Sequence, residues 1–121
     1  MIITSNYKQM KKKIAINGSG RIGRASLRAN LQRNLFEIVA INDLSDIHQT
    51  AHLIKYDTMY GTLHNKVEVD GEYIVIDGHK ILHTQERDPS KLPWKELKID
   101  IVLECTGIFK TPEKAGLHLQ A

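Results

Sequence analysis

The sequence predicts an α/β fold, a parallel sheet doubly wound by helices, with an antiparallel hairpin excursion. Three features lead to this prediction. Short apolar segments of strand length alternate with an amphipathic segment of helix length near the amino terminus. A turn with three glycines, I-N-G-S-G-R-I-G-R, joins the first apolar segment to the amphipathic one. Further along, two Asp-Gly dipeptides divide an alternating stretch, as such dipeptides do in β-hairpins.

The first three elements form one βαβ unit. Lys13–Asn17 is a short apolar strand candidate, and residues 37–41 (E-I-V-A-I) are a second one of the buried type. Between them, Arg21–Arg33 carries apolar side chains at helical spacing among its arginines. Strand, helix and strand in close succession are typical of a βαβ unit.

A second helix and the hairpin excursion come next. Asp46 is placed to cap a helix over residues 47–56. Over residues 66–84 the apolar pattern changes to period two, with Asp-Gly turns at 70–71 and 77–78. We expect the last of these segments to rejoin the main sheet.

The carboxyl-terminal part supplies one more strand and one more helix. Residues 99–103 (I-D-I-V-L) are again of the buried strand type. After Pro112, which suits the first turn of a helix, we expect a helix through Leu119.

Length and composition favour one cytoplasmic domain. The chain has 121 residues, and its single cysteine, Cys105, excludes an internal disulfide and suggests a reducing compartment. No segment resembles a signal peptide or is apolar for long enough to cross a membrane, so we expect a soluble protein without a membrane partner. We place the domain at residues 11–121, after a polar amino-terminal extension at residues 1–10.

The net charge is modestly positive. Seventeen Lys and Arg residues against fourteen Asp and Glu residues give +3, which fits either a nucleic-acid surface or a phosphate-bearing small molecule. Beyond the three lysines at 11–13, charges of both signs are interspersed and no aromatic ladder accompanies them. We therefore expect no nucleic-acid partner.

The three glycines of the turn have the G-x-G-x-x-G spacing of a phosphate cradle. Gly18 permits the tight turn, Gly20 lets a pyrophosphate approach the backbone, and Gly23 lets helix and strand pack closely. The helix amino terminus beyond them offers N–H groups and a partial positive charge. Strand, glycine turn and helix in this order indicate a dinucleotide site.

Asp43 strengthens that interpretation. It stands twenty residues past Gly23, directly after the second strand, where an acid accepts a hydrogen bond from an adenosine ribose. A carboxylate there also favours NAD over NADP, because it repels a 2′-phosphate. The alternative is that Asp43 is only a turn residue that caps the segment after it.

Arg87 and Thr106 are further candidates, since both come after strand ends, where ligands bind in doubly wound sheets. Residues 85–89 (Q-E-R-D-P) have the alternative interpretation of a solvated turn. His48 and His52 have a spacing that can hold zinc, but no third ligand is evident and no metal is expected. Cys105 is a candidate nucleophile, but a small buried residue is the favoured interpretation, because no histidine is evidently placed to activate it.

These residues form a co-linear series that resembles the amino-terminal part of phosphorylating glyceraldehyde-3-phosphate dehydrogenase, from Lys12 to Gln120. The motifs are I-N-G-x-G-R-I-G-R at 16–24, A-I-N-D at 40–43, K-Y-D at 55–57, Q-E-R-D-P-S at 85–90 and E-C-T-G-x-F at 104–109, leading into E-K-A-G-L-H-L-Q. The resemblance implies a Rossmann-type domain with NAD as cofactor, and a glycolytic homotetramer that oxidises and phosphorylates the aldehyde as it reduces NAD. Leu44 resembles the NAD-using members. The residues implied to surround the adenosine and pyrophosphate half are Asn17, Gly18, Gly20, Arg21, Ile22, Asp43, Arg87, Thr106 and Phe109.

The chain departs from the family pattern in several places. Ser19 stands where the family usually has Phe, at a loop position that we expect to be exposed, and residues 1–9 have no counterpart. The family's catalytic cysteine and its activating histidine would lie beyond Ala121, and Cys105 matches a non-catalytic position. We therefore expect no catalytic residue, and no aldehyde oxidation by these 121 residues alone.

A Rossmann sheet ordered 3-2-1-4-5-6 would be truncated here after the fourth main strand, at residues 99–103. The resulting open, apolar edge invites pairing with the rest of a dehydrogenase chain or with other copies. Two alternatives stay open. One is a stand-alone module that binds NAD or adenine nucleotides without catalysis. The other is a fragment of erythrose-4-phosphate dehydrogenase, which Q-E-R-D-P makes the weaker choice.

Overall fold

The computed structural model describes residues 11–107 and 116–121. The expected extension at 1–10, Phe109, and the expected helix up to residue 115 lie outside the described residues. Among the described residues, no helix has both the length and the apolar character that a membrane crossing requires.

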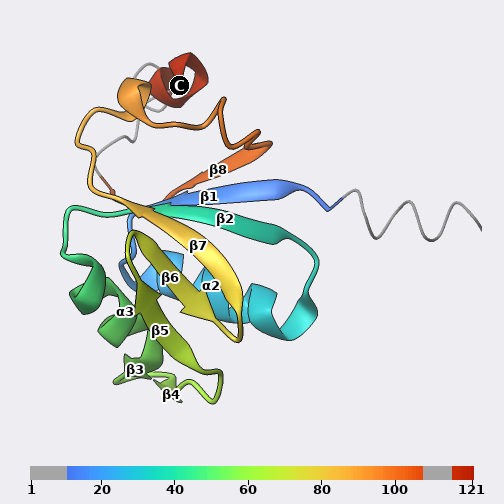
Figure 1. The fold of residues 1–121 in the computed structure, drawn as a ribbon, viewed down its shortest axis with the longest axis vertical. Helices are drawn as coiled ribbons and strands as arrows, with labels where there is room; N and C mark the ends of the chain where they lie inside the picture. The colour runs from blue at the N-terminus through green and yellow to red at the C-terminus, as the bar shows by residue number, and fades with distance from the viewer. Residues whose placement is uncertain (1–10, 108–115) are drawn as a thin grey trace, which may run out of the picture.

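A six-stranded sheet of order β5-β6-β7-β2-β1-β8 runs through the middle of the structure (Figure 1). β1 (Lys13–Asn17) pairs in parallel with β2 (Glu37–Asn42) on one side and with β8 (Ile101–Glu104) on the other. β2 pairs in parallel with β7 (His79–Thr84). These four strands have the predicted Rossmann order, 3-2-1-4, because β7, β2, β1 and β8 are the third, second, first and fourth main strands.

The antiparallel excursion is confirmed. β5 (Val67–Asp70) pairs with β6 (Tyr73–Ile76), which pairs with β7 before β7 rejoins the parallel part. At the second turn, Asp77 and Gly78 both have positive φ, 48° and 83°, as a two-residue hairpin turn requires.

Two helices lie at the predicted positions. α2 spans Arg21–Arg33, and α3 spans Ile47–Lys55, with the Asp46 carboxylate accepting a hydrogen bond from the backbone N–H of His48 at 3.0 Å. α3 ends before the predicted residue 56, because Tyr56–Asp57 (β3) leaves the helix to pair with Gly61–Thr62 (β4).

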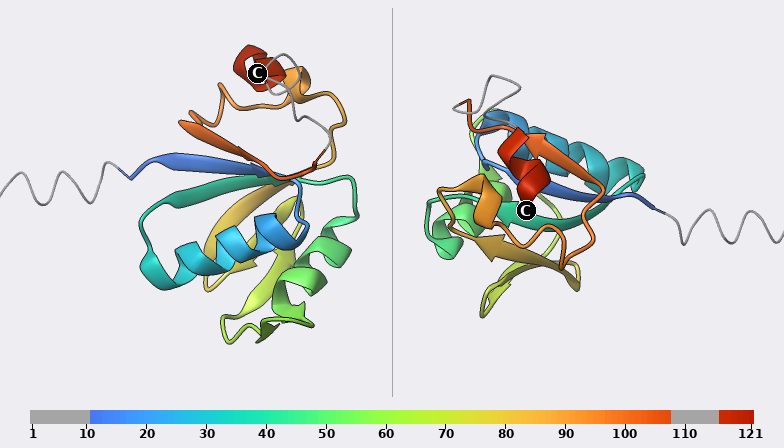
Figure 2. Two further views of the ribbon diagram at one scale, coloured as in Figure 1. Left: turned by 180° about the vertical axis from the view of Figure 1, so that it is seen from behind. Right: turned by 90° about the horizontal axis from the view of Figure 1, so that it is seen from above.

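Both faces of the sheet are covered by other parts of the chain. α2 and α3 cover one of them, where Leu27 and Ile54 pack against apolar side chains of the strands (Figure 2). On the opposite face, Leu92 and Trp94 pack on Ala15 and Ala40. The two alanines leave room there for the indole.

The second face is covered by irregular segments within the described residues. They include the 3₁₀ turns η1 (Pro89–Lys91) and η2 (Gly116–Gln120), which lie on the side of the sheet opposite α2 (Figures 1 and 2). Residues 116–120 therefore form a 3₁₀ turn rather than the predicted α-helical end. The fourth strand begins at Ile101 instead of 99, after a left-handed residue at Lys98 (φ 56°), and Ile101 is 40% exposed at the sheet edge.

Candidate nucleotide site

Each parallel strand ends in a polar residue, at the same edge of the sheet. These residues are Asn17 on β1, Asn42 on β2, Thr84 on β7 and Glu104 on β8. Asn17 and Asn42 are buried, at 2% and 4% exposed. Buried polar side chains need hydrogen-bond partners, and these residues supply partners to one another.

Asn42 joins three strand ends. Its Nδ2 donates to Asn17 Oδ1 at 2.7 Å and to the backbone oxygen of Glu86 at 2.8 Å. Its Oδ1 accepts from the Thr84 hydroxyl at 2.7 Å and from the Glu86 N–H at 2.8 Å. The loops after β1, β2 and β7 are therefore held at fixed positions relative to one another.

The glycine turn has the geometry predicted for it. Gly18 has φ +99°, and a Cβ there would lie 2.9 Å from the Thr106 backbone nitrogen. A Cβ on Gly23 would clash with the Gly18 carbonyl oxygen, which confirms the close packing of α2 against β1. By contrast, a Cβ on Gly20 would meet no atom within 4 Å. Gly20 thus faces open space at the amino terminus of α2, which fits the expected approach of a pyrophosphate.

A cavity of about 410 Å³ opens beside this turn and is called the nucleotide cavity below. Six of the nine predicted cofactor residues line it: Asn17, Gly18, Gly20, Asp43, Arg87 and Thr106. Leu44, Asn42, Glu86 and Cys105 complete its lining. Arg21 and Ile22 do not line it and lie exposed on the first turn of α2.

Asp43 is tied to the glycine turn. Its Oδ2 accepts hydrogen bonds from the Ser19 N–H and the Ser19 hydroxyl, both at 2.7 Å, and its Oδ1 accepts from the Ser45 N–H at 2.9 Å. Burial opposes ionisation of this carboxyl, but the hydrogen bonds from Ser19 and Ser45 outweigh burial and lower the pKa of Asp43 below its ordinary value. Asp43 is therefore a carboxylate at neutral pH.

The prediction that Ser19 is exposed is wrong. Ser19 is only 6% exposed, because its backbone and hydroxyl turn inward to the Asp43 carboxylate. The same residue anchors the turn on its other side, where the Arg24 guanidinium donates to the Ser19 carbonyl at 2.9 Å and lies 3.5 Å from the Asp57 carboxylate. Sequence reasoning did not identify the role of Arg24.

Cys105 lines the nucleotide cavity and is partly buried rather than fully buried. Burial, with the nearby charge of Glu104, raises the pKa of its thiol. A nucleophilic cysteine needs a lowered pKa, so this environment agrees with the non-catalytic interpretation. Within residues 11–107 and 116–121, no group of three His, Cys, Asp or Glu side chains is placed to hold a metal ion.

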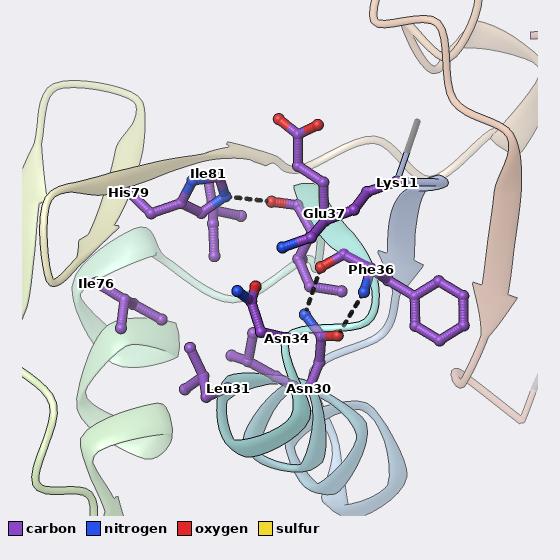
Figure 3. A pocket seen from close by; sticks show the side chains of 11 residues that line it. Lys11, Asn30, Leu31, Asn34, Phe36, Glu37, Ile76, His79 and Ile81 are labelled. Carbon is purple, nitrogen blue, oxygen red and sulfur yellow. Dashed lines mark hydrogen bonds between the residues drawn. The ribbon is translucent and has the colours of Figure 1, made fainter. Parts of the chain in front are cut away.

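A second cavity, of about 380 Å³, lies at the other end of the strands, between α2 and β7 (Figure 3). Two of its polar side chains bind the backbone: Asn30 exchanges hydrogen bonds with the Phe36 backbone at 2.8 and 2.9 Å, and His79 Nε2 lies 2.8 Å from the Ile38 carbonyl oxygen. In a doubly wound sheet, ligands bind beyond the carboxyl ends of the strands. The nucleotide cavity is therefore the stronger candidate.

Sequence reasoning missed three of the strand-end residues, Asn42, Thr84 and Glu104. A signal was present, because the first two strands end alike, in I-A-I-N and V-A-I-N. A polar residue that closes a buried apolar strand needs a partner, and in a parallel sheet the neighbouring strand ends supply it.

Comparison with known proteins agrees with this geometry. Residues 12–112 match the family described as "Glyceraldehyde 3-phosphate dehydrogenase, NAD binding domain". The chain is 52% identical over 114 residues to glyceraldehyde-3-phosphate dehydrogenase of Zymomonas mobilis, covering 93% of this chain and 34% of that protein. It is 48% identical over 114 residues to the chromosomal enzyme of Cupriavidus necator, covering 92% and 34%. The chain thus spans about a third of the length of the curated relatives it matches.

Proposed function

Since the chain belongs to the glyceraldehyde-3-phosphate dehydrogenase family, as its NAD-binding domain, we propose that it binds NAD in the nucleotide cavity. The observation that carries the proposal is the open space at Gly20, beside an ionised Asp43 and at the amino terminus of α2. The residues proposed to surround the adenosine and pyrophosphate half are Asn17, Gly18, Gly20, Arg21, Ile22, Asp43, Arg87, Thr106 and Phe109.

The roles of these residues derive from their positions. Asp43 accepts a hydrogen bond from the ribose, and the backbone of the glycine turn approaches the pyrophosphate closely because Gly20 has no side chain. Arg21, on the first turn of α2, and Arg87, which lines the nucleotide cavity, are exposed cations. They offset phosphate charge without the cost of burying an unpaired charge.

Gly20 offers a direct test. Its φ of −70° suits any residue, and an added Cβ would meet no protein atom within 4 Å, so Gly20→Ala and Gly20→Val should fold. We expect NAD affinity, measured by calorimetry, to fall from wild type to Ala to Val as the side chain fills the pyrophosphate space. Gln32→Val places the same branched side chain at an exposed position of the same helix, about 18 Å along its axis, and serves as the control. Equal NAD affinity in all four proteins would overturn the proposal.

For the whole protein we propose the activity of the family: oxidation and phosphorylation of glyceraldehyde 3-phosphate to 1,3-bisphosphoglycerate, in the cytoplasm, by a homotetramer. NAD is the hydride acceptor in that reaction. The present 121 residues supply its binding site and not the attacking thiol, because the environment of Cys105 keeps the thiol protonated. The chain on its own should show no reduction of NAD with this aldehyde and phosphate. NADH formation that is lost in Cys105→Ala would contradict this assignment.

We further propose that β8 pairs with the rest of a dehydrogenase chain or with another copy. Among the described residues, β8 is the last strand at its side of the sheet, and Ile101 is 40% exposed there. An apolar groove of about 310 Å³ adjoins it, lined by Phe36 of the loop after α2 and by Leu103 of β8. A free strand edge beside apolar surface favours association.

A further inference from the structure

A polar network connects the carboxyl-terminal turn η2 to the end of β8. The indole Nε1 of Trp94 donates to His118 Nδ1 at 3.0 Å, and His118 Nε2 lies 2.6 Å from Glu104 Oε2. Trp94 and His118 are buried, at 3% and 8% exposed. The network therefore links three separate segments of the chain: residue 94, η2 and β8.

The hydrogen-bond partners fix the proton on His118. An indole N–H can only donate, so His118 Nδ1 must accept and carries no proton in this arrangement. His118 Nε2 then carries the proton and donates it to Glu104. The imidazole is held in one tautomer, in line between an indole and a carboxylate.

Glu104 also accepts hydrogen bonds from two residues of the nucleotide cavity. Its Oε2 accepts from the Asn17 amide at 2.7 Å, and its Oε1 accepts from the Thr106 N–H at 3.0 Å and the Thr106 hydroxyl at 2.6 Å. With His118, these partners all act as donors, which a carboxylate can satisfy and a neutral carboxamide cannot. Asn17 and Thr106 are thus oriented by one side chain, and that side chain does not line the nucleotide cavity.

The network is sensitive to the loss of any member. Removing one partner leaves a buried donor or acceptor without a hydrogen bond. The free energy lost when a buried network is broken therefore exceeds that of a single hydrogen bond. Ring stacking of Trp94 on His118, with centroids 6.2 Å apart, joins the packing of η2 to the hydrogen bonds. The position of η2 and the orientation of Asn17 and Thr106 are therefore energetically connected.

We propose that Glu104 is a positioning residue of the NAD site and that His118 couples the docking of η2 to it. The proposal rests on the proposed function, because Asn17 and Thr106 matter here as nucleotide contacts. Coupling of this kind is reciprocal. If η2 docking favours nucleotide binding, nucleotide binding must in turn stabilise η2 docking.

The first test uses the wild-type chain and needs no mutation. Trp94 is the only tryptophan, so its indole N–H gives one resolved signal in a ¹H–¹⁵N spectrum. We expect this signal to shift saturably as ADP-ribose is added, with the same Kd as calorimetry gives. ADP-ribose lacks the nicotinamide, and Trp94 is not among the described residues that line the nucleotide cavity, so a direct contact does not explain such a shift.

The second test uses two variants. Glu104→Gln should weaken ADP-ribose binding by about tenfold, the equivalent of one hydrogen bond. Trp94→Phe, which keeps an aromatic ring but removes the indole N–H, should weaken it less. In the double variant the two losses should be smaller than their sum, since both break one network. Glu68→Gln, on the exposed side of β5, is the matched control and should bind as the wild type does.

The outcomes separate the two proposals. No binding of ADP-ribose or NAD by the wild type would overturn the proposed function and the inference with it. Binding with an unmoved indole signal and unchanged affinity in Trp94→Phe would overturn the inference and leave the proposed function standing. Additive losses in the double variant would likewise overturn the coupling.

Discussion

Replacing Asp43 with alanine should change the preference between NAD and NADP, not only the affinity. The carboxylate has a proposed role toward the ribose, and a structural role through Ser19 and Ser45. A hydrogen bond to a charged group contributes about 1.5–3 kcal/mol, so loss of one ribose bond should weaken NAD binding by about 10- to 150-fold. For NADP, the loss is opposed by removal of the like charge that faces the 2′-phosphate.

The two roles of Asp43 can be separated by a matched variant. Ser19→Ala removes one hydrogen bond between the glycine turn and Asp43, at 2.7 Å, and keeps the carboxylate. Any loosening of the turn in Ser19→Ala should therefore affect NAD and NADP by the same factor. The assay is calorimetric titration of wild type, Asp43→Ala and Ser19→Ala with each dinucleotide, after thermal melting has shown that each variant is folded.

The ratio of the two Kd values decides between the interpretations. We expect the ratio of NADP Kd to NAD Kd to fall by about tenfold or more in Asp43→Ala and to stay constant in Ser19→Ala. An equal loss for both dinucleotides in Asp43→Ala would refute the ribose role. Asp43 would then be the turn residue of the alternative interpretation.

Three further outcomes are expected. Ser19→Ala should lower the free energy of unfolding in urea by about 1.5 kcal/mol, because it removes a hydrogen bond to a partly buried carboxylate; an unchanged midpoint would contradict this. Burial lowers the pKa of His83 below 6.5, although the charges of Asp43 and Asp46 oppose this shift. As the pH falls below 6.5, the unfolded chain binds a proton at His83 more readily than the folded chain does, so the free energy of unfolding should decrease. Well above pH 6.5 the imidazole is neutral in both states and contributes no pH dependence. Urea titrations at a series of pH values should show that His83→Gln lacks the loss of stability on the acid side. Ile101→Lys should shift the chain toward monomer in light scattering, since an edge lysine opposes strand pairing, whereas unchanged association would show that β8 is not the contact.

The sequence was most informative where a residue's role depends on its own backbone. The glycine spacing predicted the turn, the helix start and the approach of α2 to β1, because the positive φ of Gly18 and the contact of Gly23 with Gly18 are local features of the backbone. The Asp-Gly turns predicted the hairpins for the same reason. Where the chain leaves a helix was less predictable: α3 ends early because β3 finds a partner in β4, and a two-residue strand pair carries no periodicity.

The supporting side chains of the site could not be predicted in this way. Ser19 was expected to be exposed because it occupies a loop position where the family usually has Phe, but its backbone N–H and hydroxyl bind the Asp43 carboxylate, twenty-four positions away. Glu104 and Asn17 are separated by eighty-seven positions. No spacing rule links such residues, and they meet only because β1 and β8 are neighbours in the sheet.

The central claim is that a dinucleotide binds at the carboxyl ends of the parallel strands, against the amino terminus of α2. The most direct measurement is a titration of the ¹⁵N-labelled chain with NAD, monitored through the backbone amide signals. We predict saturable shifts at residues 18–22, 43–44 and 105–107, with the signals of residues 30–36 and 79–81, around the second cavity, unchanged. Shifts gathered around that second cavity, or no saturable shift at all, would contradict the account.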